Sequence, residues 1–129
     1  MRGVLQELLA DGLRDQPNVC AAYLFGSCAR GTQRPGSDVD VGIWLRKTPV
    51  TFDECPLELA GALEHELGQR VDLVVMNGAP SDLVHRILRD GILVLENDRA
   101  ARIAFEMQAR NDFFDMARIR ALYRRGEPA

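Results

Sequence analysis

The chain has 129 residues, of which 47% are hydrophobic and 27% are charged, and its formal net charge is −3. This length predicts a single domain over residues 1–129 with one ordinary hydrophobic core. No apolar run approaches the ~20 residues of a membrane-spanning helix, and the N-terminus lacks the apolar segment of a signal peptide. Cys20, Cys28 and Cys55 have no metal-ligand spacing, which indicates reduced thiols in a cytoplasmic protein.

The charge is unevenly distributed along the chain. Segment 99–125 carries seven arginines and three acidic residues, a net charge of +4, so the remainder carries −7. A protein that binds long nucleic acids usually has a wide basic surface, and the acidic body argues against that class of substrate. The basic segment predicts either a solvated helix face or a docking surface for an acidic partner.

The first half of the chain alternates between helical and strand patterns. Apolar residues at helical spacing predict a helix over residues 2–14, which Pro17 ends. Runs rich in β-branched and aromatic residues predict strands over residues 19–25 and 38–45. Between them, residues 31–37 are rich in glycine, proline and polar residues and predict a loop. The two strands are therefore expected to pair as antiparallel neighbours.

The second half continues the alternation. Its predicted elements, in chain order, are helix 56–67, strand 70–75, helix 81–89, strand 92–95 and helix 97–125. Gly68 ends the first of these helices, and Asn97 or Asp98 caps the last. The pattern predicts an α/β fold in which a small mixed sheet is flanked by helices, with a core over residues 1–96 and a long C-terminal helix.

The most informative segment spans residues 24–40. Gly26 and Ser27 follow the first apolar run, and Asp38 and Asp40 lie two positions apart in the second. Residues i and i+2 of a strand share a face, so both carboxylates are expected to point one way and the neighbouring valines into the core. Adjacent carboxylates repel unless a cation separates them, and oxygen ligands suit Mg²⁺ with substrate phosphates completing its shell. The Gly-Ser turn offers backbone N–H groups and a hydroxyl to a phosphate.

A third carboxylate fits this scheme. Asp72 lies near the start of the predicted strand 70–75. If this strand pairs beside the strand that carries Asp38 and Asp40, three carboxylates converge. Three carboxylates are enough to hold two metal ions at roughly 3.5–4 Å, the arrangement used for phosphoryl or nucleotidyl transfer.

These motifs, in this order, resemble the DNA polymerase β-type nucleotidyltransferase superfamily. The string Gly26-Ser27-x-Ala29-Arg30-Gly31 followed by Ser37-Asp38-Val39-Asp40 is similar to its smallest branch, the minimal nucleotidyltransferases. The resemblance implies the polymerase β-type fold and transfer of a nucleoside monophosphate from a nucleoside triphosphate. It implies that Asp38 and Asp40 bridge two Mg²⁺ ions, and that Asp72 binds one of them and accepts or orients the acceptor proton. Gly26 and Ser27 would hold the β and γ phosphates.

Arg30 has two interpretations. A guanidinium binds phosphate oxygens bidentately, so Arg30 is predicted to contact the triphosphate. The alternative is a structural ion pair with a nearby aspartate.

The chain leaves almost no room for a domain that binds the acceptor, so the acceptor is expected to dock from outside or an oligomer to complete the site. Stand-alone minimal nucleotidyltransferases resemble antitoxins that pair with a helical HEPN-domain ribonuclease toxin and transfer AMP from ATP to one of its tyrosines. The resemblance therefore implies a cytoplasmic, Mg²⁺-dependent protein adenylyltransferase with a HEPN toxin as partner. Two alternatives are an enzyme that modifies a small-molecule hydroxyl, such as that of an aminoglycoside, and a non-catalytic module that masks a partner protein.

The predicted C-terminal helix has an apolar stripe that is expected to pack on the protein's own core. Its members are Ile103, Met107, Phe114, Ala117 and Ala121. Arg102, Arg120 and Arg124 on the opposite face would then remain free to attract an acidic surface.

Overall fold

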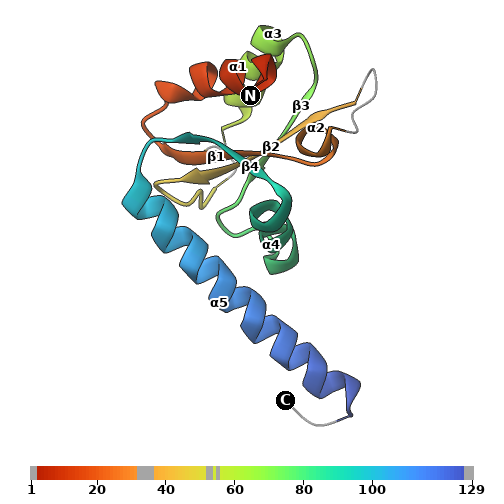
Figure 1. The fold of residues 1–129 in the computed structure, drawn as a ribbon. Helices are drawn as coiled ribbons and strands as arrows, with labels where there is room; N and C mark the ends of the chain where they lie inside the picture. Colours follow the sequence, from red (N-terminus) through yellow and green to blue (C-terminus); the bar gives the residue numbers. More distant parts are fainter. Residues whose placement is uncertain (1–2, 32–36, 52–53, 55, 127–129) are drawn as a thin grey trace.

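The computed structural model describes residues 3–31, 37–51, 54 and 56–126. Its centre is a four-stranded sheet with the strand order β3-β2-β1-β4 (Figure 1). The strands are β1 (Val19–Phe25), β2 (Val39–Leu45), β3 (Val71–Val75) and β4 (Ile92–Glu96). β1 pairs antiparallel with both β2 and β4, and β2 pairs parallel with β3. The mixed sheet confirms the expected α/β fold class and the antiparallel pairing of the first two strands.

Five helices accompany the sheet in the described part of the chain. They are α1 (Val4–Arg14), α2 (Ser27–Arg30), α3 (Leu57–Leu67), α4 (Ser81–Asp90) and α5 (Arg99–Arg124). The four longer helices and all four strands were predicted to within two residues at each end. The one-turn helix α2 was not predicted, because four residues are too few for helical periodicity to be visible. Gly68 ends α3 in the left-handed conformation, with φ +68°, as expected of a helix C-terminus.

The alternation of β2 divides the interior into two layers. Val39, Val41 and Ile43 are fully buried and pack in one cluster with leucines of α1 and α3. Trp44 belongs to a second cluster, which includes Ile87 of α4. Because successive residues of a strand point to opposite faces, the burial of the two valines that flank Asp40 fixes its side chain on the α4 side of the sheet.

Helix α5 begins beside the sheet and extends away from it. Asp98 caps it, accepting a hydrogen bond from the Ala101 backbone N–H at 3.0 Å, which confirms one of the two predicted caps. Phe105 stacks on Trp44 with ring centroids 5.1 Å apart, and the C-terminal half of the helix extends beyond the sheet (Figure 1), where it contacts α4. No residue of α5 is buried. Among the described residues, no helix, α5 included, is long and apolar enough to cross a membrane.

The predicted packing of the α5 stripe is wrong. Ile103, Met107 and Phe114 are 43%, 59% and 64% exposed. The face that packs on the body instead carries Phe105 and the alanines one turn before and after it. Several apolar stripes run along this helix, and its periodicity alone does not decide which of them meets the core.

Two of the three arginines expected to be free are in ion pairs. Arg102 donates to Glu96, and its Nη1 lies 3.0 Å from Oε2 of Glu106. Arg120 Nη2 lies 2.6 Å from Oδ2 of Asp82 on α4. These pairs connect α5 to β4 and α4. The carboxylate partners come from elements whose position beside α5 cannot be read from the sequence of the helix.

Acidic side chains around the start of α5 are held in their charged form. Hydrogen bonds from Arg99 and then Arg102 keep the pKa of Glu96 below its usual value. The Ala101 backbone N–H is the largest cause that lowers the pKa of Asp98. A carboxylate whose pKa is lower in the folded state stabilises the protein above its unfolded pKa, and this stabilisation is lost as pH falls.

We therefore expect the attachment of α5 to weaken in acid. The Glu96→Gln variant should have a lower Tm than the native protein at pH 7. This difference should begin to shrink as pH falls below about 4.3, the usual pKa of a glutamate. It should vanish once pH has fallen through the lower pKa that Glu96 has in the folded protein, because its ion pairs are then lost in the native protein too. Thermal unfolding between pH 7 and 3 measures this, with Glu58→Gln on the exposed face of α3 as control. A Tm difference that is the same at every pH would contradict the assignment.

Candidate active site

Three of the predicted site residues meet where β1 ends. Phe25, the last residue of β1, lies opposite Asp40 in the antiparallel register, and Asp40 lies opposite Asp72 in the parallel register of β2 and β3. The two aspartates are thus cross-strand neighbours on one face of the sheet, and Gly26 follows directly after Phe25. The pairing of the Asp72 strand beside the Asp40 strand, on which the convergence of carboxylates depended, is confirmed.

A pocket of about 460 Å³ opens at this point. It lies between the strand ends and helix α4. It is lined by Phe25, Gly26, Asp40, Asp72, Val74, Leu83, Arg86 and Asp90.

Gly26 is in close contact with the Asp40 carboxylate. Its backbone has φ +72°, a region that residues with a side chain rarely adopt. A Cβ at this position would lie 2.2 Å from Oδ2 of Asp40. Glycine is therefore required twice over, by the backbone conformation and by the space that the carboxylate occupies.

Ser27 and Arg30 are the first and last residues of α2. Ser27 is half-buried and directly follows Gly26, which lines the pocket, but Ser27 is not itself among the lining residues. The first N–H groups of a helix have no partner within it, which is compatible with the predicted phosphate cradle of Gly26 and Ser27. The cradle and the phosphate contact of Arg30 stay predictions. Arg34 in the predicted loop 31–37 is a weaker candidate for a phosphate contact and lies outside the described residues.

Asp38 lies outside the pocket. It precedes β2 rather than belonging to it, and its Oδ1 lies 3.9 Å from Nε of Arg70 in an exposed ion pair. Asp38 is absent from the described side chains that line the pocket. A residue before the first ladder position is not held on one face by strand pairing, so the expectation that Asp38 and Asp40 act together stays a prediction.

The Cys28 thiol is not a candidate nucleophile. Burial raises its pKa, and the negative charge of Asp40 raises it further. The nucleophilic form of a cysteine is the thiolate, so this side chain stays protonated and unreactive at neutral pH. The chemistry of the pocket therefore rests on its carboxylates.

Helix α4 supplies two charged residues that sequence reasoning did not single out. Leu83, Arg86 and Asp90 follow one another at helical spacing and line the pocket, whereas Val84 and Ile87 are buried in the core. The spacing was visible in the sequence. The sequence did not show that these residues face the site, because that depends on helix α4 lying across the side of the sheet that carries Asp40 and Asp72.

The donor set suits a hard divalent cation. Asp40 and Asp72 present carboxylate oxygens from neighbouring strands, and Mg²⁺ is usually held by one or two carboxylates, several waters and substrate phosphates. Among the described residues, no three His, Cys, Asp or Glu side chains lie close enough to hold a metal on their own. The pocket therefore fits a cation that arrives with a phosphate ligand better than one held entirely by protein.

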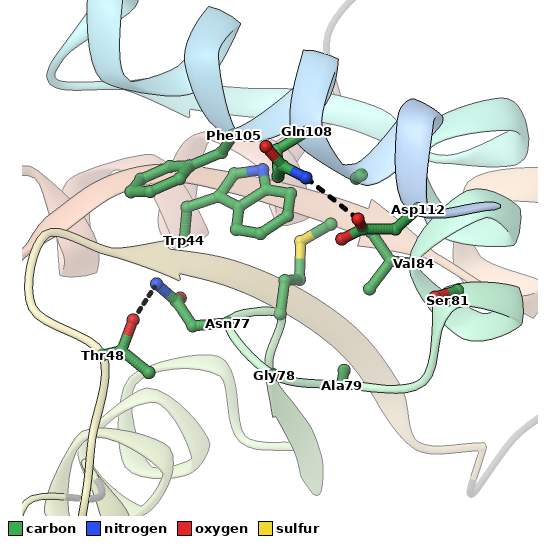
Figure 2. A pocket seen from close by; sticks show the side chains of 12 residues that line it. Trp44, Thr48, Asn77, Gly78, Ala79, Ser81, Val84, Phe105, Gln108 and Asp112 are labelled. Atoms are coloured by element: carbon green, nitrogen blue, oxygen red, sulfur yellow. Dashed lines mark hydrogen bonds between the residues drawn. The ribbon is translucent and has the colours of Figure 1, made fainter. Parts of the chain in front are cut away.

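A second pocket, of about 210 Å³, lies at the other end of β2 beneath α5 (Figure 2). Trp44 and Phe105 stack at its side, and its polar groups bond to one another. The Asn77 side chain exchanges two 2.8 Å hydrogen bonds with the Leu45 backbone, and Gln108 donates to Asp112 at 2.9 Å. The Asn77 bonds fasten the chain after β3 to β2, and the Gln108 bond lies within α5, so we assign this pocket a structural role.

Comparison with known proteins gives the same family. Residues 7–100 match the family model described as "Polymerase beta, Nucleotidyltransferase". Protein adenylyltransferase MntA of Thermococcus cleftensis is 36% identical over 87 residues, which cover 64% of this chain and 81% of the relative.

Solved structures resemble the chain over nearly its whole length. The crystal structure of a toxin–antitoxin with AMP-PNP contains a chain that is 25% identical, with a TM-score of 0.76 and coverage of 92% of this chain and 94% of that chain. The complex of a tri-AMPylated HEPN toxin with an MNT antitoxin from Shewanella oneidensis contains a chain with the same fold. That chain is 22% identical, with a TM-score of 0.72 and 95% coverage of both chains. By its fold, its pocket and its match to the family model, the chain belongs to the polymerase β nucleotidyltransferase family.

Proposed function

We propose that this chain is a protein adenylyltransferase that transfers AMP from ATP to a tyrosine hydroxyl of a HEPN-domain toxin, and thereby acts as its antitoxin in the cytoplasm. The observation that carries the proposal is the meeting of Gly26, Asp40 and Asp72 in one pocket of a chain that belongs to a nucleotidyltransferase family. The 36% identical relative is named a protein adenylyltransferase, and the 25% identical chain comes from a toxin–antitoxin with an ATP analogue.

In the proposed reaction, the acceptor oxygen forms a bond to the α-phosphorus of ATP. The bond from that phosphorus to the bridging oxygen breaks, and pyrophosphate leaves. Gly26 and Ser27 position the β and γ phosphates, and Asp72 accepts or orients the proton of the acceptor hydroxyl. Asp40 and Asp72, joined by Asp38, would hold Mg²⁺, as two ions if all three carboxylates converge. When bound, Mg²⁺ neutralises phosphate charge and makes the acceptor hydroxyl more acidic.

One transfer experiment tests the function. The purified chain is incubated with ATP, Mg²⁺ and a HEPN-domain toxin, and the toxin is analysed by intact mass and peptide mapping. We expect a mass gain of one or more AMP units on tyrosine, and none when Mg²⁺ is chelated. A tight complex without modification would favour the masking module instead. AMP transfer to an aminoglycoside in a parallel reaction, with none to the toxin, would favour a small-molecule enzyme.

We further propose that the toxin docks on α5. Met107 and Phe114 are 59% and 64% exposed and share the face of α5 that points away from the body. This helix belongs to the +4 segment of an otherwise acidic chain. Of the 129 residues, 98 precede α5, so the 92% match to the chain from a toxin–antitoxin complex includes much of this helix. An apolar helix face needs a covering partner.

Replacing both Met107 and Phe114 by glutamate should weaken the complex with the toxin by at least about a hundredfold. Each side chain contributes roughly 1.5–3 kcal/mol when its apolar surface is buried. Binding of MgATP should not change, because neither residue lines the Asp40 pocket. Calorimetric titration with the toxin measures the affinity. Val4→Glu is the matched control, since Val4 is 73% exposed and lies on α1. Native affinity in the double variant would exclude this face of α5 as the docking surface.

A further inference from the structure

Helix α4 is held by the core and by α5, and this orientation places Arg86 at the pocket wall. Val84 and Ile87 are 4% and 0% exposed and belong to the core cluster around Trp44. His85 stacks face to face on Phe113 of α5, with ring centroids 3.7 Å apart and an interplanar angle of 5°. Core packing and the contact with α5 together prevent the helix from rotating about its axis, so the face that carries Arg86 stays turned toward the pocket.

Arg86 differs from nearby arginines because its guanidinium is not used in an ion pair with another described residue. Its neighbour Arg89 forms a two-pronged pair with Asp90, at 2.9 Å and 2.8 Å. Arg70 and Arg120 pair with aspartates elsewhere. Within the described residues, no ion pair involves Arg86. Two reasons argue against an ion pair between Arg86 and Asp90. The cation would be on the N-terminal side, which is the weaker orientation for an i,i+4 pair on a helix. In addition, Arg89 already binds the Asp90 carboxylate.

The charge around the pocket explains why a cation is needed there. Three carboxylates line it, those of Asp40, Asp72 and Asp90, whereas Arg86 is the one basic side chain among the described lining residues. A nucleoside triphosphate is itself strongly negative, and a cation bound at Asp40 and Asp72 neutralises only the strand side. A guanidinium offers donors in a planar fork that matches two phosphate oxygens.

We propose that Arg86 binds the phosphate oxygens of the incoming nucleoside triphosphate from the α4 side of the pocket. The assignment rests on the proposed function and names a residue of the same site. The triphosphate lies between the backbone of Gly26 on the strand side and the Arg86 guanidinium on the helix side, with the nucleoside toward the apolar lining of Phe25, Val74 and Leu83. Arg86 is thus a binding residue that positions the leaving pyrophosphate.

The test measures the affinity of three ligands for the native protein and for three variants, by titration in the presence of Mg²⁺. The ligands are ATP, AMP and adenosine, and the variants are Arg86→Ala, Arg86→Lys and Arg14→Ala. Hydrogen bonds to charged groups contribute about 1.5–3 kcal/mol, so Arg86→Ala should bind ATP roughly ten- to a hundredfold more weakly. Adenosine affinity should be unchanged. Arg86→Lys keeps the charge without the fork and should lie between. Arg14→Ala removes an exposed arginine that pairs with Asp11 on α1 and should match the native protein.

Transfer kinetics separate this inference from the proposed function. We expect Arg86→Ala to raise KM for ATP, leave KM for the toxin unchanged and unfold at the native Tm. Native ATP affinity in Arg86→Ala, or equal losses for ATP and adenosine, would overturn the phosphate assignment while leaving the proposed function in place. A rise in KM for the toxin alone would overturn it too, by showing an acceptor contact. If the native protein bound no MgATP at all, both the proposed function and this assignment would be wrong.

Discussion

Replacing Asp38 and Asp40 together by asparagine is expected to abolish AMP transfer and leave the fold intact. Asparagine keeps the shape of each side chain but loses the charge that holds a divalent cation and its phosphate ligands. Loss of that charge stabilisation removes several kcal/mol from the transition state, and about 4 kcal/mol corresponds to roughly a thousandfold in rate. The Tm should be unchanged or slightly higher, because Asp40 faces Asp72 across the sheet and neighbouring carboxylates repel.

Single variants show how much of the loss of AMP transfer is due to each position. Asp40→Asn and Asp72→Asn should each come close to the double variant, because both side chains line the pocket. Asp38→Asn alone decides whether Asp38 turns away from Arg70 to join them when nucleotide and Mg²⁺ bind. Asp11→Asn removes an exposed carboxylate on α1 and controls for net charge. AMP transfer at the native rate in the double variant, measured by toxin mass, would show that these carboxylates are not the metal ligands.

Much of the fold could be predicted because its strands are short apolar runs rich in β-branched and aromatic residues and bounded by turn residues. Val39 and Val41 are fully buried, and that burial turns Asp40 to the other face of β2. The position of Asp72 beside Asp40 could not be predicted from the strand patterns alone. It depends on β2 and β3 lying parallel and adjacent, with α3 as the crossover, and neither propensity nor pattern gives the order of strands in a sheet. The family resemblance supplied that order, and the structure has it.

The wrong predictions concern surfaces whose partners come from distant elements. On α5, the stripe of Ile103, Met107 and Phe114 and the stripe around Phe105 are both helical, and only the stacking of Phe105 on Trp44 shows which one meets the body. Arg102 was judged free because its carboxylate partner on β4 lies beside it only in the folded chain. Arg86 went unnoticed for the same reason.

Gly26→Ala is expected to impair catalysis and stability together, although it adds only one methyl group. The new Cβ would lie 2.2 Å from Oδ2 of Asp40, so the carboxylate or the turn must move, and a displacement of this size at a catalytic group reduces the rate by about a hundredfold or more. A side chain at φ +72° also strains the backbone by about 1–3 kcal/mol, which corresponds to a Tm lower by roughly 4–12 °C. Both AMP transfer and MgATP affinity should fall.

Gly68→Ala separates the two effects of that substitution. Gly68 has φ +68° at the end of α3, and a Cβ there would have no atom within 4 Å. It therefore introduces a positive-φ side chain without any contact with a carboxylate, and its strain is smaller, because Gly68 has ψ +22° in the left-handed helical region whereas Gly26 has ψ −152°. We expect Gly68→Ala to lower the Tm less than Gly26→Ala does, and to transfer AMP at the native rate below its own unfolding temperature. Equal loss of transfer in the two variants would attribute the effect to stability. Native nucleotide affinity in Gly26→Ala would exclude Gly26 from the phosphate cradle.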